Sequence, residues 1–345
     1  MIFQSQGIWM VAGTHKLKYC TTLFFFLATT SLVLAEEAGP DCPNEKPAAL
    51  RTDDEVWLLS CRGLDCVAQG GMVTAEQLTQ GLAAWRFDLT GKTWKRSELD
   101  PLLKTTPSPQ TVVWVHGNLT TASEAFSDGL TLYRRLVNDS EIQTPIRFII
   151  WSWPASKILT RPVPDARIKA ARTTSSGFRL AGVLQSLPPE SEVSLIGFSF
   201  GARVVSATME LLAGGELNST SLDLTSGFDS DGYRVTLFAA ALDSTWLLPD
   251  HRFGMALQVV NHLTLINNYC DRILKHYGKL YCHCARQGPS ALGYTGLPDG
   301  HLPTDERDAI DQFNASGSIG KQHAWRPYVE SSTTMELIRS GTFGK

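Results

Sequence analysis

Five consecutive residues of this sequence have the types and the spacing of a nucleophilic serine site. Gly197-Phe198-Ser199-Phe200-Gly201 is a G-x-S-x-G pattern, with an apolar run at 192–196 before it and an amphipathic run at 200–212 after it. A strand before this pattern and a helix after it are the setting in which such a serine stands exposed on a sharp turn. Glycines on both sides allow the strand and the helix to approach closely, because they have no Cβ. The sequence therefore predicts Ser199 as a nucleophile.

A second loop is predicted to stabilise the negative charge that such a reaction develops. His116-Gly117-Asn118 follows a valine-rich run at 111–115. The carboxyl ends of parallel strands share one edge of a sheet, so this loop and Ser199 should open on the same side. Acyl transfer needs two N–H donors for the oxyanion, and we expect the backbone N–H groups of Phe200 and Asn118 to supply them. His116 is expected to pack its own turn rather than to react.

A serine nucleophile also needs a histidine base and a carboxylate that orients the base. In this arrangement both follow the serine along the chain, the acid before the histidine. Asp271 and Asp243 each end an apolar run after Ser199. Asp271 is favoured because it follows the later run and lies in a polar break, whereas Asp243 is followed by two hydroxyl residues and is expected to cap the next helix. His323, just before a terminal helical segment, is the expected base, with His301 as the alternative.

The apolar pattern predicts the elements that would position these residues. Short runs rich in β-branched and aromatic residues predict strands at 56–60, 84–96 (two strands around a turn), 111–115, 146–151, 192–196, 233–241 and 262–266. Apolar residues at helical spacing predict helices at 123–136, 167–187, 200–212 and 327–339. Strands that alternate with helices and are almost continuously apolar indicate an α/β fold, with a mostly parallel central sheet and helices on both faces.

The first 35 residues have the pattern of an export signal. Lys16 and Lys18 precede an uncharged run at 23–35, which ends in Val33-Leu34-Ala35. This run is too short to cross a bilayer as a helix, which takes roughly 20 apolar residues. We expect a signal peptide at 1–35, an exposed lead-in at 36–54, one large domain at 55–345, and no integral membrane span after cleavage. An uncleaved anchor is the alternative, and the expected location is secreted or periplasmic.

Composition and cysteine content agree with an exported globular enzyme. The 345 residues are 19% charged and 43% hydrophobic, with a formal net charge of −3, so nothing indicates a nucleic-acid partner. Beyond the signal six cysteines remain: Cys42, Cys61, Cys66, Cys270, Cys282 and Cys284. An even number in an oxidising compartment predicts disulfides, with Cys61 and Cys66 as a plausible local pair and Cys42 as an alternative partner. Their spacing fits no standard zinc pattern, so we expect no metal.

The sequence resembles the α/β-hydrolases, and more narrowly a bacterial group of them that is mostly uncharacterised and classed as a domain of unknown function. The matching pieces are Trp57-Leu58-Leu59-Ser60-Cys61-Arg62, Val115-His116-Gly117, Trp151-Ser152-Trp153-Pro154, Gly197-Phe198-Ser199-Phe200-Gly201, Asn268-Tyr269-Cys270-Asp271-Arg272-Ile273-Leu274, Ala291-Leu292-Gly293-Tyr294-Thr295-Gly296 and His323. Similar proteins commonly have Ser-Thr-Arg where this chain has Ser60-Cys61-Arg62. The resemblance implies an α/β-hydrolase domain at 55–345, a Ser–Asp–His hydrolase and no cofactor.

The expected function is a serine hydrolase that cleaves carboxylic esters of small-molecule or lipid-like substrates through an acyl-enzyme. Other acyl hydrolases, namely lipases, thioesterases and peptidases, use the same machinery, and the fold itself hosts many functions. A non-catalytic binding protein on the same fold is an alternative of a different class. Its expected mark is the loss of one of the three reactive side chains, and this sequence has candidates for all three.

Overall fold

The computed structural model describes residues 50–105, 109–138, 142, 144–224, 232–280 and 289–344. All of them belong to one compact unit, Pro47–Lys345. The expected signal peptide at 1–35, most of the expected lead-in (36–49), and Cys42, Cys282 and Cys284 lie outside the described residues.

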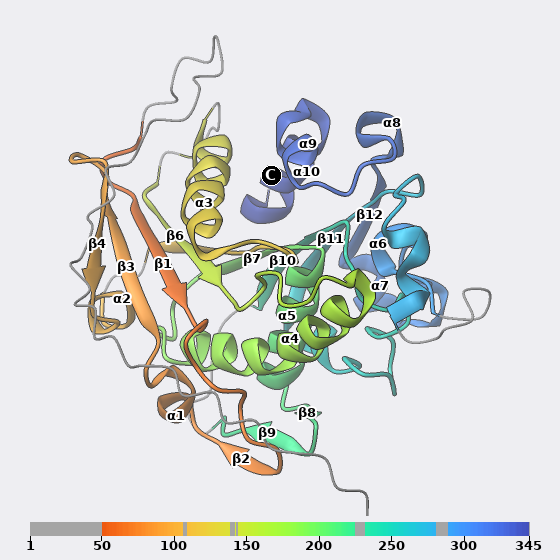
Figure 1. Ribbon diagram of the computed structural model, residues 1–345, viewed down its shortest axis with the longest axis horizontal. Helices are drawn as coiled ribbons and strands as arrows, with labels where there is room; N and C mark the ends of the chain where they lie inside the picture. Colours follow the sequence, from red (N-terminus) through yellow and green to blue (C-terminus); the bar gives the residue numbers. More distant parts are fainter. Residues whose placement is uncertain are drawn as a thin grey trace, which may run out of the picture. The chain divides into compact units, whose positions relative to one another are not determined.

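A nine-stranded sheet forms the centre of this unit (Figure 1). Seven neighbouring strands run parallel, and an antiparallel hairpin extends the sheet at one edge. In spatial order the strands are β12 (Ile310–Asn314), β11 (Val260–Asn267), β10 (Tyr233–Phe238), β7 (Val193–Phe198), β5 (Gln110–Val115), β6 (Ile146–Ser152), β1 (Glu55–Ser60), β3 (Ala83–Asp88) and β4 (Thr93–Ser97). The predicted fold class, with its mostly parallel sheet, is confirmed.

Helices cover both faces of this sheet, as Figure 1 shows. On one face lie α3 (Ala122–Val137), α9 (Arg326–Glu330) and α10 (Ser332–Phe343), and on the other lie α4 (Pro162–Gln185) and α5 (Phe200–Leu212). Glycine permits close contacts between these elements. A Cβ on Gly341 of α10 would lie 2.4 Å from the Thr236 hydroxyl on β10, and one on Gly177 of α4 would lie 2.7 Å from the Ala207 Cβ on α5.

The central strands are apolar because both of their faces are covered. Every residue of β6 and β7 is buried, and the side chains of Trp57, Trp114 and Trp151 on β1, β5 and β6 are fully inaccessible. Aromatic rings of this size contribute a large share of the apolar area that stabilises the fold. No helix of the described ranges is both long and apolar enough to cross a membrane.

The remaining elements are short. They are α1 (Ala75–Thr79), α2 (Asp100–Leu103), α6 (Leu292–Thr295), α7 (Thr304–Asp308), α8 (Ser316–Ile319), the 3₁₀ helices η1 (Ala256–Val259), η2 (Leu274–Leu280) and η3 (Asp299–His301), and a small sheet of β2 (Gly71–Val73), β9 (Thr220–Leu222) and β8 (Glu216–Leu217).

Several elements differ from the sequence-based expectation: the predicted helix at 327–339 is divided into α9 and α10, and the predicted strand at 233–241 ends at Phe238. The strand β12 and the small sheet have no continuous apolar run, because β12 is a partly exposed edge strand and the strands of the small sheet are only two or three residues long. The helix α4 begins at Pro162 rather than at residue 167, since proline suits the first turn of a helix, where its missing N–H has no partner to lose.

The end of the expected lead-in takes part in the fold. Asp54 is buried, and its carboxylate accepts hydrogen bonds from the Ile146 backbone N–H (2.9 Å) and the Tyr133 hydroxyl (2.7 Å). This carboxylate therefore joins the start of β1 to the start of β6 and to α3.

Candidate active site

Ser199 stands on a strained turn between β7 and α5. Its backbone has φ 53° and ψ −116°, a region that a residue with a side chain adopts only at a cost of roughly 1–3 kcal/mol. The flanking glycines make the turn possible. A Cβ on Gly197 would lie 2.8 Å from the Ala202 Cα, and a Cβ on Gly201 would lie 2.0 Å from the carbonyl oxygen of Val115 on β5. Strand, turn and helix therefore pack too closely for any larger residue at these two positions.

The backbone around Ser199 is held from the neighbouring strand. The Ser199 N–H donates to the Phe238 carbonyl (3.2 Å), and the Ser199 carbonyl accepts from the Ala241 N–H (3.1 Å). Phe238 is the last residue of β10, and Ala241 lies in the loop that follows it. These two hydrogen bonds keep the strained conformation in place, so the side chain is presented at the same edge of the sheet at which β10 and β11 end.

Three side chains from distant parts of the chain form one hydrogen-bonded series at this edge. The Ser199 Oγ lies 2.9 Å from the His323 Nε2, and the His323 Nδ1 lies 2.7 Å from the Asp271 Oδ2. Since Nδ1 faces a carboxylate, it carries the proton, and Nε2 is left to accept one from the serine. Ser199 is 4% exposed and the His323 side chain 17% exposed, so the series is shielded but not sealed from solvent.

The Asp271 carboxylate is fully buried, and its two oxygens have different hydrogen-bond partners. Its Oδ1 accepts hydrogen bonds from the backbone N–H groups of Ile273 (2.8 Å) and Leu274 (2.9 Å) at the start of η2. Its Oδ2 faces His323. The two backbone donors fix the plane of the carboxylate, which in turn fixes the orientation of the imidazole.

Hydrogen bonds from two sides hold the loop that carries His323. On one side the buried Asn268 donates its side-chain N–H to the carbonyls of Gly320 (2.9 Å) and Gln322 (3.4 Å). On the other side Asp128 of α3 accepts hydrogen bonds from the Trp325 indole (3.2 Å) and the Arg326 guanidinium (3.0 Å).

The sequence alone predicts no role for Asn268 or Asp128. Asn268 was visible only as part of a matching motif, and nothing in the sequence links Asp128 to a loop almost 200 residues away.

The expected oxyanion loop lies directly against the serine. A Cβ on Gly117 would lie 2.6 Å from the Phe198 ring and 3.2 Å from the Ser199 Cβ, so only glycine fits there. The loop then continues through Leu119, which has φ 68°. A hydrogen bond from the Leu119 N–H to the Ala155 carbonyl (3.0 Å) holds this conformation.

The two expected oxyanion donors have no other acceptor in the described part of the chain. Phe200 is the first residue of α5, so its N–H lies before the first intrahelical hydrogen bond, and the N–H of Asn118 likewise makes none with the described residues. The positive end of the α5 dipole also points at this position. Both groups are therefore available to a ligand oxygen beside Ser199.

His116 supports this loop and lies outside the hydrogen-bonded series. Its Nδ1 donates to the Gly117 carbonyl (2.9 Å), its Nε2 accepts from Arg62 (3.1 Å), and its ring stacks on Trp153 at 5.7 Å. Complete burial, together with the nearby Arg62 charge, lowers the pKa of His116 to about 3. His116 is thus a neutral packing residue.

Arg62 joins three loops at the carboxyl edge of the sheet. Its guanidinium donates to the Ser152 hydroxyl (2.7 Å), the Ser156 hydroxyl (3.1 Å) and the Thr120 carbonyl (3.0 Å), in addition to the His116 ring. Its role was not recognised from the sequence, although the residue belongs to one of the matching motifs.

The alternative acid and base lie elsewhere. The Asp243 Oδ1 accepts hydrogen bonds from the backbone N–H and the hydroxyl of Thr245, both at 2.9 Å, and so caps the turn that follows β10. His301 is exposed in η3. Neither side chain forms a hydrogen bond or an ion pair with Ser199 or His323 among the residues that the structure places, so the structure brings together Ser199, His323 and Asp271.

The expected pairing of Cys61 with Cys66 is wrong for this structure, in which both are free thiols. Cys61 is buried, 3.8 Å from the Ser176 hydroxyl, whereas Cys66 is exposed, so the two side chains lie in different environments. Cys270 is also free, and a pairing that involves Cys42, Cys282 or Cys284 lies outside the described residues. Within those residues no group of three or more His, Cys, Asp or Glu side chains is arranged to hold a metal ion.

Part of the chain matches the model of a sequence family. Residues 92–243, somewhat less than half of the chain, match the model of DUF900, described as an alpha/beta hydrolase of unknown function. The matched range contains His116, Asn118 and Ser199 and ends before Asp271 and His323. No curated protein gives a significant match.

Three solved structures show a distant likeness. Acyl-protein thioesterase 2 from Zea mays has a TM-score of 0.38 at 14% identity, over 69% of this chain and 95% of that chain. Esterase B from Lactobacillus rhamnosis, inhibited by a tributyrin phosphonate, has a TM-score of 0.36 at 14% identity, over 76% and 80%. An iodinated acetyl xylan esterase has a TM-score of 0.31 at 15% identity, over 68% and 98%. These likenesses are too distant to indicate a substrate. From its sheet topology and the sequence match, the chain is an α/β-hydrolase-fold protein that resembles this family of unknown function.

Proposed function

We propose that this protein is an exported serine hydrolase that cleaves carboxylic esters, with Ser199 as the nucleophile, His323 as the base and Asp271 as the orienting acid. The observation that carries the proposal is the unbroken series Ser199 Oγ–His323 Nε2 (2.9 Å) and His323 Nδ1–Asp271 Oδ2 (2.7 Å) at a strained, glycine-flanked turn. Such strain is kept at sites where it serves to present a reactive group.

The reaction proceeds in two halves. His323 Nε2 takes the Ser199 proton while Oγ attacks the ester carbonyl carbon, and the carbonyl oxygen becomes an oxyanion that the N–H groups of Phe200 and Asn118 stabilise. When the intermediate collapses, the C–O bond to the alcohol breaks and the imidazolium gives its proton to the departing alkoxide. Water, deprotonated by His323, then attacks the acyl-enzyme and releases the acid, and Ser199 regains its proton.

Apolar side chains next to the reactive residues favour an uncharged, apolar ester as substrate. Leu119, directly after Asn118, is 56% exposed, and Ile273, two residues after Asp271, is 62% exposed. The Phe198 ring lies 5.5 Å from the His323 ring. The Leu119 and Ile273 side chains both lie on loops that supply the site, and loops positioned by a rigid sheet commonly carry binding residues.

Labelling with a fluorophosphonate probe tests the nucleophile. The wild-type protein is expected to be labelled and Ser199→Ala to remain unlabelled. Ser206→Ala is the matched control, because Ser206 is also a buried serine, in the middle of α5, and its hydroxyl has no partner among the described residues. Labelling that survives Ser199→Ala would assign the nucleophile elsewhere, and a wild-type protein that resists the probe would favour the non-catalytic binding protein.

Substrate preference separates an esterase from the related acyl hydrolases. We expect p-nitrophenyl esters of graded acyl length to be cleaved, with a kcat/KM higher than that of thioesters and anilides with the same acyl groups. A higher kcat/KM for the thioester would reassign the protein to the thioesterases, and a higher value for the anilide would indicate a peptidase.

The location is proposed from residues 1–35 alone. Mature protein from the cell envelope or the medium is expected to begin at Glu36. Mass spectrometry of the N-terminus measures this, and an intact N-terminus on mature protein would indicate a retained anchor instead.

A further inference from the structure

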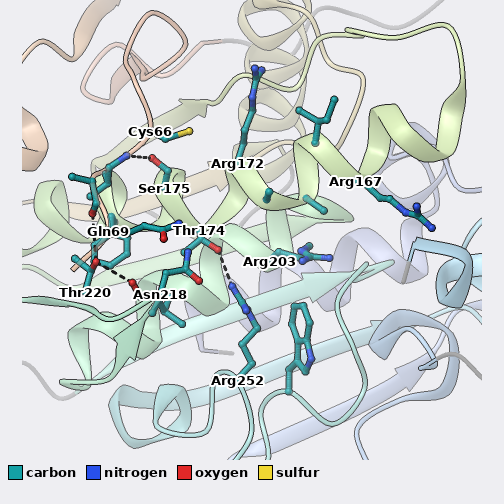
Figure 2. A pocket seen from close by; sticks show the side chains of 18 of the residues that line it. Cys66, Gln69, Arg167, Arg172, Thr174, Ser175, Arg203, Asn218, Thr220 and Arg252 are labelled. Atoms are coloured by element: carbon teal, nitrogen blue, oxygen red, sulfur yellow. Dashed lines mark hydrogen bonds between the residues drawn. The ribbon is translucent and has the colours of Figure 1, made fainter. Parts of the chain in front are cut away.

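Residues of α4 and α5 line a separate pocket. Figure 2 shows it from close by. Its volume is about 720 Å³, and its lining comes from α4, α5, the segment after β1, the β8–β9 turn and the turn after β10. This volume is in the usual range for small-molecule sites. Neither Ser199 nor His323 is among the described residues that line it. The pocket is therefore a second candidate site on the molecule.

The lining of this pocket is strongly basic although the whole chain is not. Four arginines line it, Arg167 and Arg172 from α4, Arg203 from α5 and Arg252 from the turn after β10, and no Asp or Glu occurs among its described lining residues. The formal net charge of the full chain is −3. The positive potential here thus comes from local placement of guanidinium groups, and a concave wall of one sign concentrates the opposite charge.

Two of these guanidinium groups are fixed beside one aromatic ring. Arg203 lies 4.7 Å and Arg252 5.2 Å from the centroid of the Trp246 ring. Arg252 also donates to the Thr174 hydroxyl (3.1 Å), as the dashed line in Figure 2 marks. Stacking and hydrogen bonding fix both side chains before any ligand arrives, which lowers the entropy that binding would cost.

Arg172, unlike Arg203 and Arg252, is not held in one position by such contacts. It is partly exposed, and the structure gives it no hydrogen bond, ion pair or ring contact with any other described residue. It also lines a smaller neighbouring hollow beside Cys66 and Arg179. Its guanidinium, on a long side chain that extends from α4 (Figure 2), can turn toward a ligand without losing a structural contact.

The pocket also has an apolar wall. Phe178 and Ile168 of α4 and Leu217 of β8 line it together with the arginines. A small inorganic anion would leave this wall and most of the volume unfilled. The lining therefore matches a ligand with an anionic head and an apolar part.

From these observations we propose that the pocket binds a phosphate ester with an apolar substituent. Arg172, Arg203 and Arg252 hold the phosphate oxygens, and the apolar wall holds the substituent. Phosphate suits this set because its several charged oxygens accept from more than one guanidinium at once. The same chemistry occurs in a free phosphorylated small molecule and in a phospholipid headgroup.

Isothermal titration of the full-length mature protein with hexyl phosphate tests the proposal. This probe carries no carboxylic ester, so the proposed hydrolase activity cannot consume it. We expect one equivalent to bind, more tightly than inorganic phosphate, and neutral hexyl glucoside not to bind. Arg172→Gln and Arg252→Gln should each weaken the binding about tenfold, as for the loss of one charge-assisted hydrogen bond. Arg96→Gln, the same change on the edge strand β4, should leave it unaltered.

Two results would overturn the proposal. One is the absence of saturable binding to the wild-type protein, and the other is equal affinity in wild type, Arg172→Gln and Arg252→Gln. Because Arg172 makes no hydrogen bond, ion pair or ring contact with another described residue, its replacement by the similarly long Gln should not disturb folding, and a loss of binding in that variant then reports on the ligand. Sedimentation with vesicles of phosphatidylglycerol, against vesicles of phosphatidylcholine, distinguishes the sources. Binding that Arg172→Gln reduces supports the headgroup, and binding to hexyl phosphate alone supports the free ligand.

Discussion

The indole N–H of Trp325 donates a hydrogen bond of 3.2 Å to the Asp128 carboxylate, which joins the loop of His323 to the helix α3 on one face of the sheet. Arg326 donates to the other oxygen of the same carboxylate (3.0 Å). The Trp325 ring packs in turn on Trp114 of β5, at 5.7 Å between centroids. The position of the proposed base thus depends on a carboxylate that does not touch the reaction.

Removal of this carboxylate is expected to reduce the rate without changing substrate affinity. In Asp128→Ala the loop loses the hydrogen bonds of Trp325 and Arg326 to this carboxylate. Misplacement of His323 by about 1 Å should then lower kcat some tenfold to a hundredfold, with little change in KM. Asp128→Asn should recover part of the loss, since its amide oxygen can still accept from Trp325. Steady-state kinetics on a p-nitrophenyl ester measure both parameters.

The control for Asp128 is Asp305→Ala, the same change at an exposed position on α7. It should leave kcat at the wild-type value. A KM that rises while kcat stays constant in Asp128→Ala would show that the carboxylate shapes the binding surface rather than the position of the base.

Replacement of the two candidate acids is expected to give opposite results. Asp271→Asn cannot hold the imidazole in the correct tautomer, and the same change in a well-studied serine protease cost about 10⁴ in turnover. Asp243→Asn should have almost full activity, because an asparagine oxygen can still accept the two hydrogen bonds from Thr245. Circular dichroism must match between the two variants, and a larger loss in Asp243→Asn would move the acid to Asp243.

The buried His116 predicts a specific dependence of stability on pH. Its folded-state pKa, about 3, lies below the ordinary value of 6.5, so the unfolded chain takes up a proton that the folded protein does not. This group therefore favours the folded state fully above pH 6.5, and its contribution falls as the pH drops from 6.5 toward 3. The expected slope is up to about 1.4 kcal/mol of unfolding free energy per pH unit.

Urea unfolding of wild type and His116→Gln between pH 4 and pH 8 measures this slope. The variant should be less stable at pH 7, and the difference between the two proteins should shrink as the pH falls. His251→Gln, which changes an exposed histidine in a turn, is the control and should follow the wild type. A constant difference between wild type and His116→Gln across the range would contradict the assignment.

The two neighbouring thiols are expected to react at very different rates. Burial raises the pKa of the Cys61 thiol to about 11, so it has little thiolate and no access to a reagent. Cys66 is exposed. After mild reduction, iodoacetamide at pH 8 should modify Cys66 in the native protein and Cys61 only after denaturation. Peptide mass spectrometry identifies the sites, and early modification of Cys61 would place it outside the core.

Several features of the protein follow from the sequence because they depend on neighbouring residues. The apolar runs that become β1, β5, β6, β7, β10 and β11 are strands because both faces are covered, and that cover shows in the sequence as unbroken hydrophobicity. The turn at Ser199 is equally local, since Gly197 and Gly201 flank the serine directly and clear the space that the turn needs. Where a strand is short or half exposed, as in β12 and β8, this signal is missing.

The remaining features were decided by the tertiary structure alone. From the order of residues along the chain, Asp243 is an alternative to Asp271 as the acid and His301 an alternative to His323 as the base. The order cannot decide between them, because spacing along the chain does not measure distance across a sheet. In the fold Asp243 caps a turn, whereas Asp271 is buried and lies 2.7 Å from His323. In the same way the hydrogen bond from Trp325 to Asp128 joins residues almost 200 positions apart. Such pairs meet only because the covered, twisted sheet brings the ends of its strands and the loops after them to one edge, and no local pattern records that meeting.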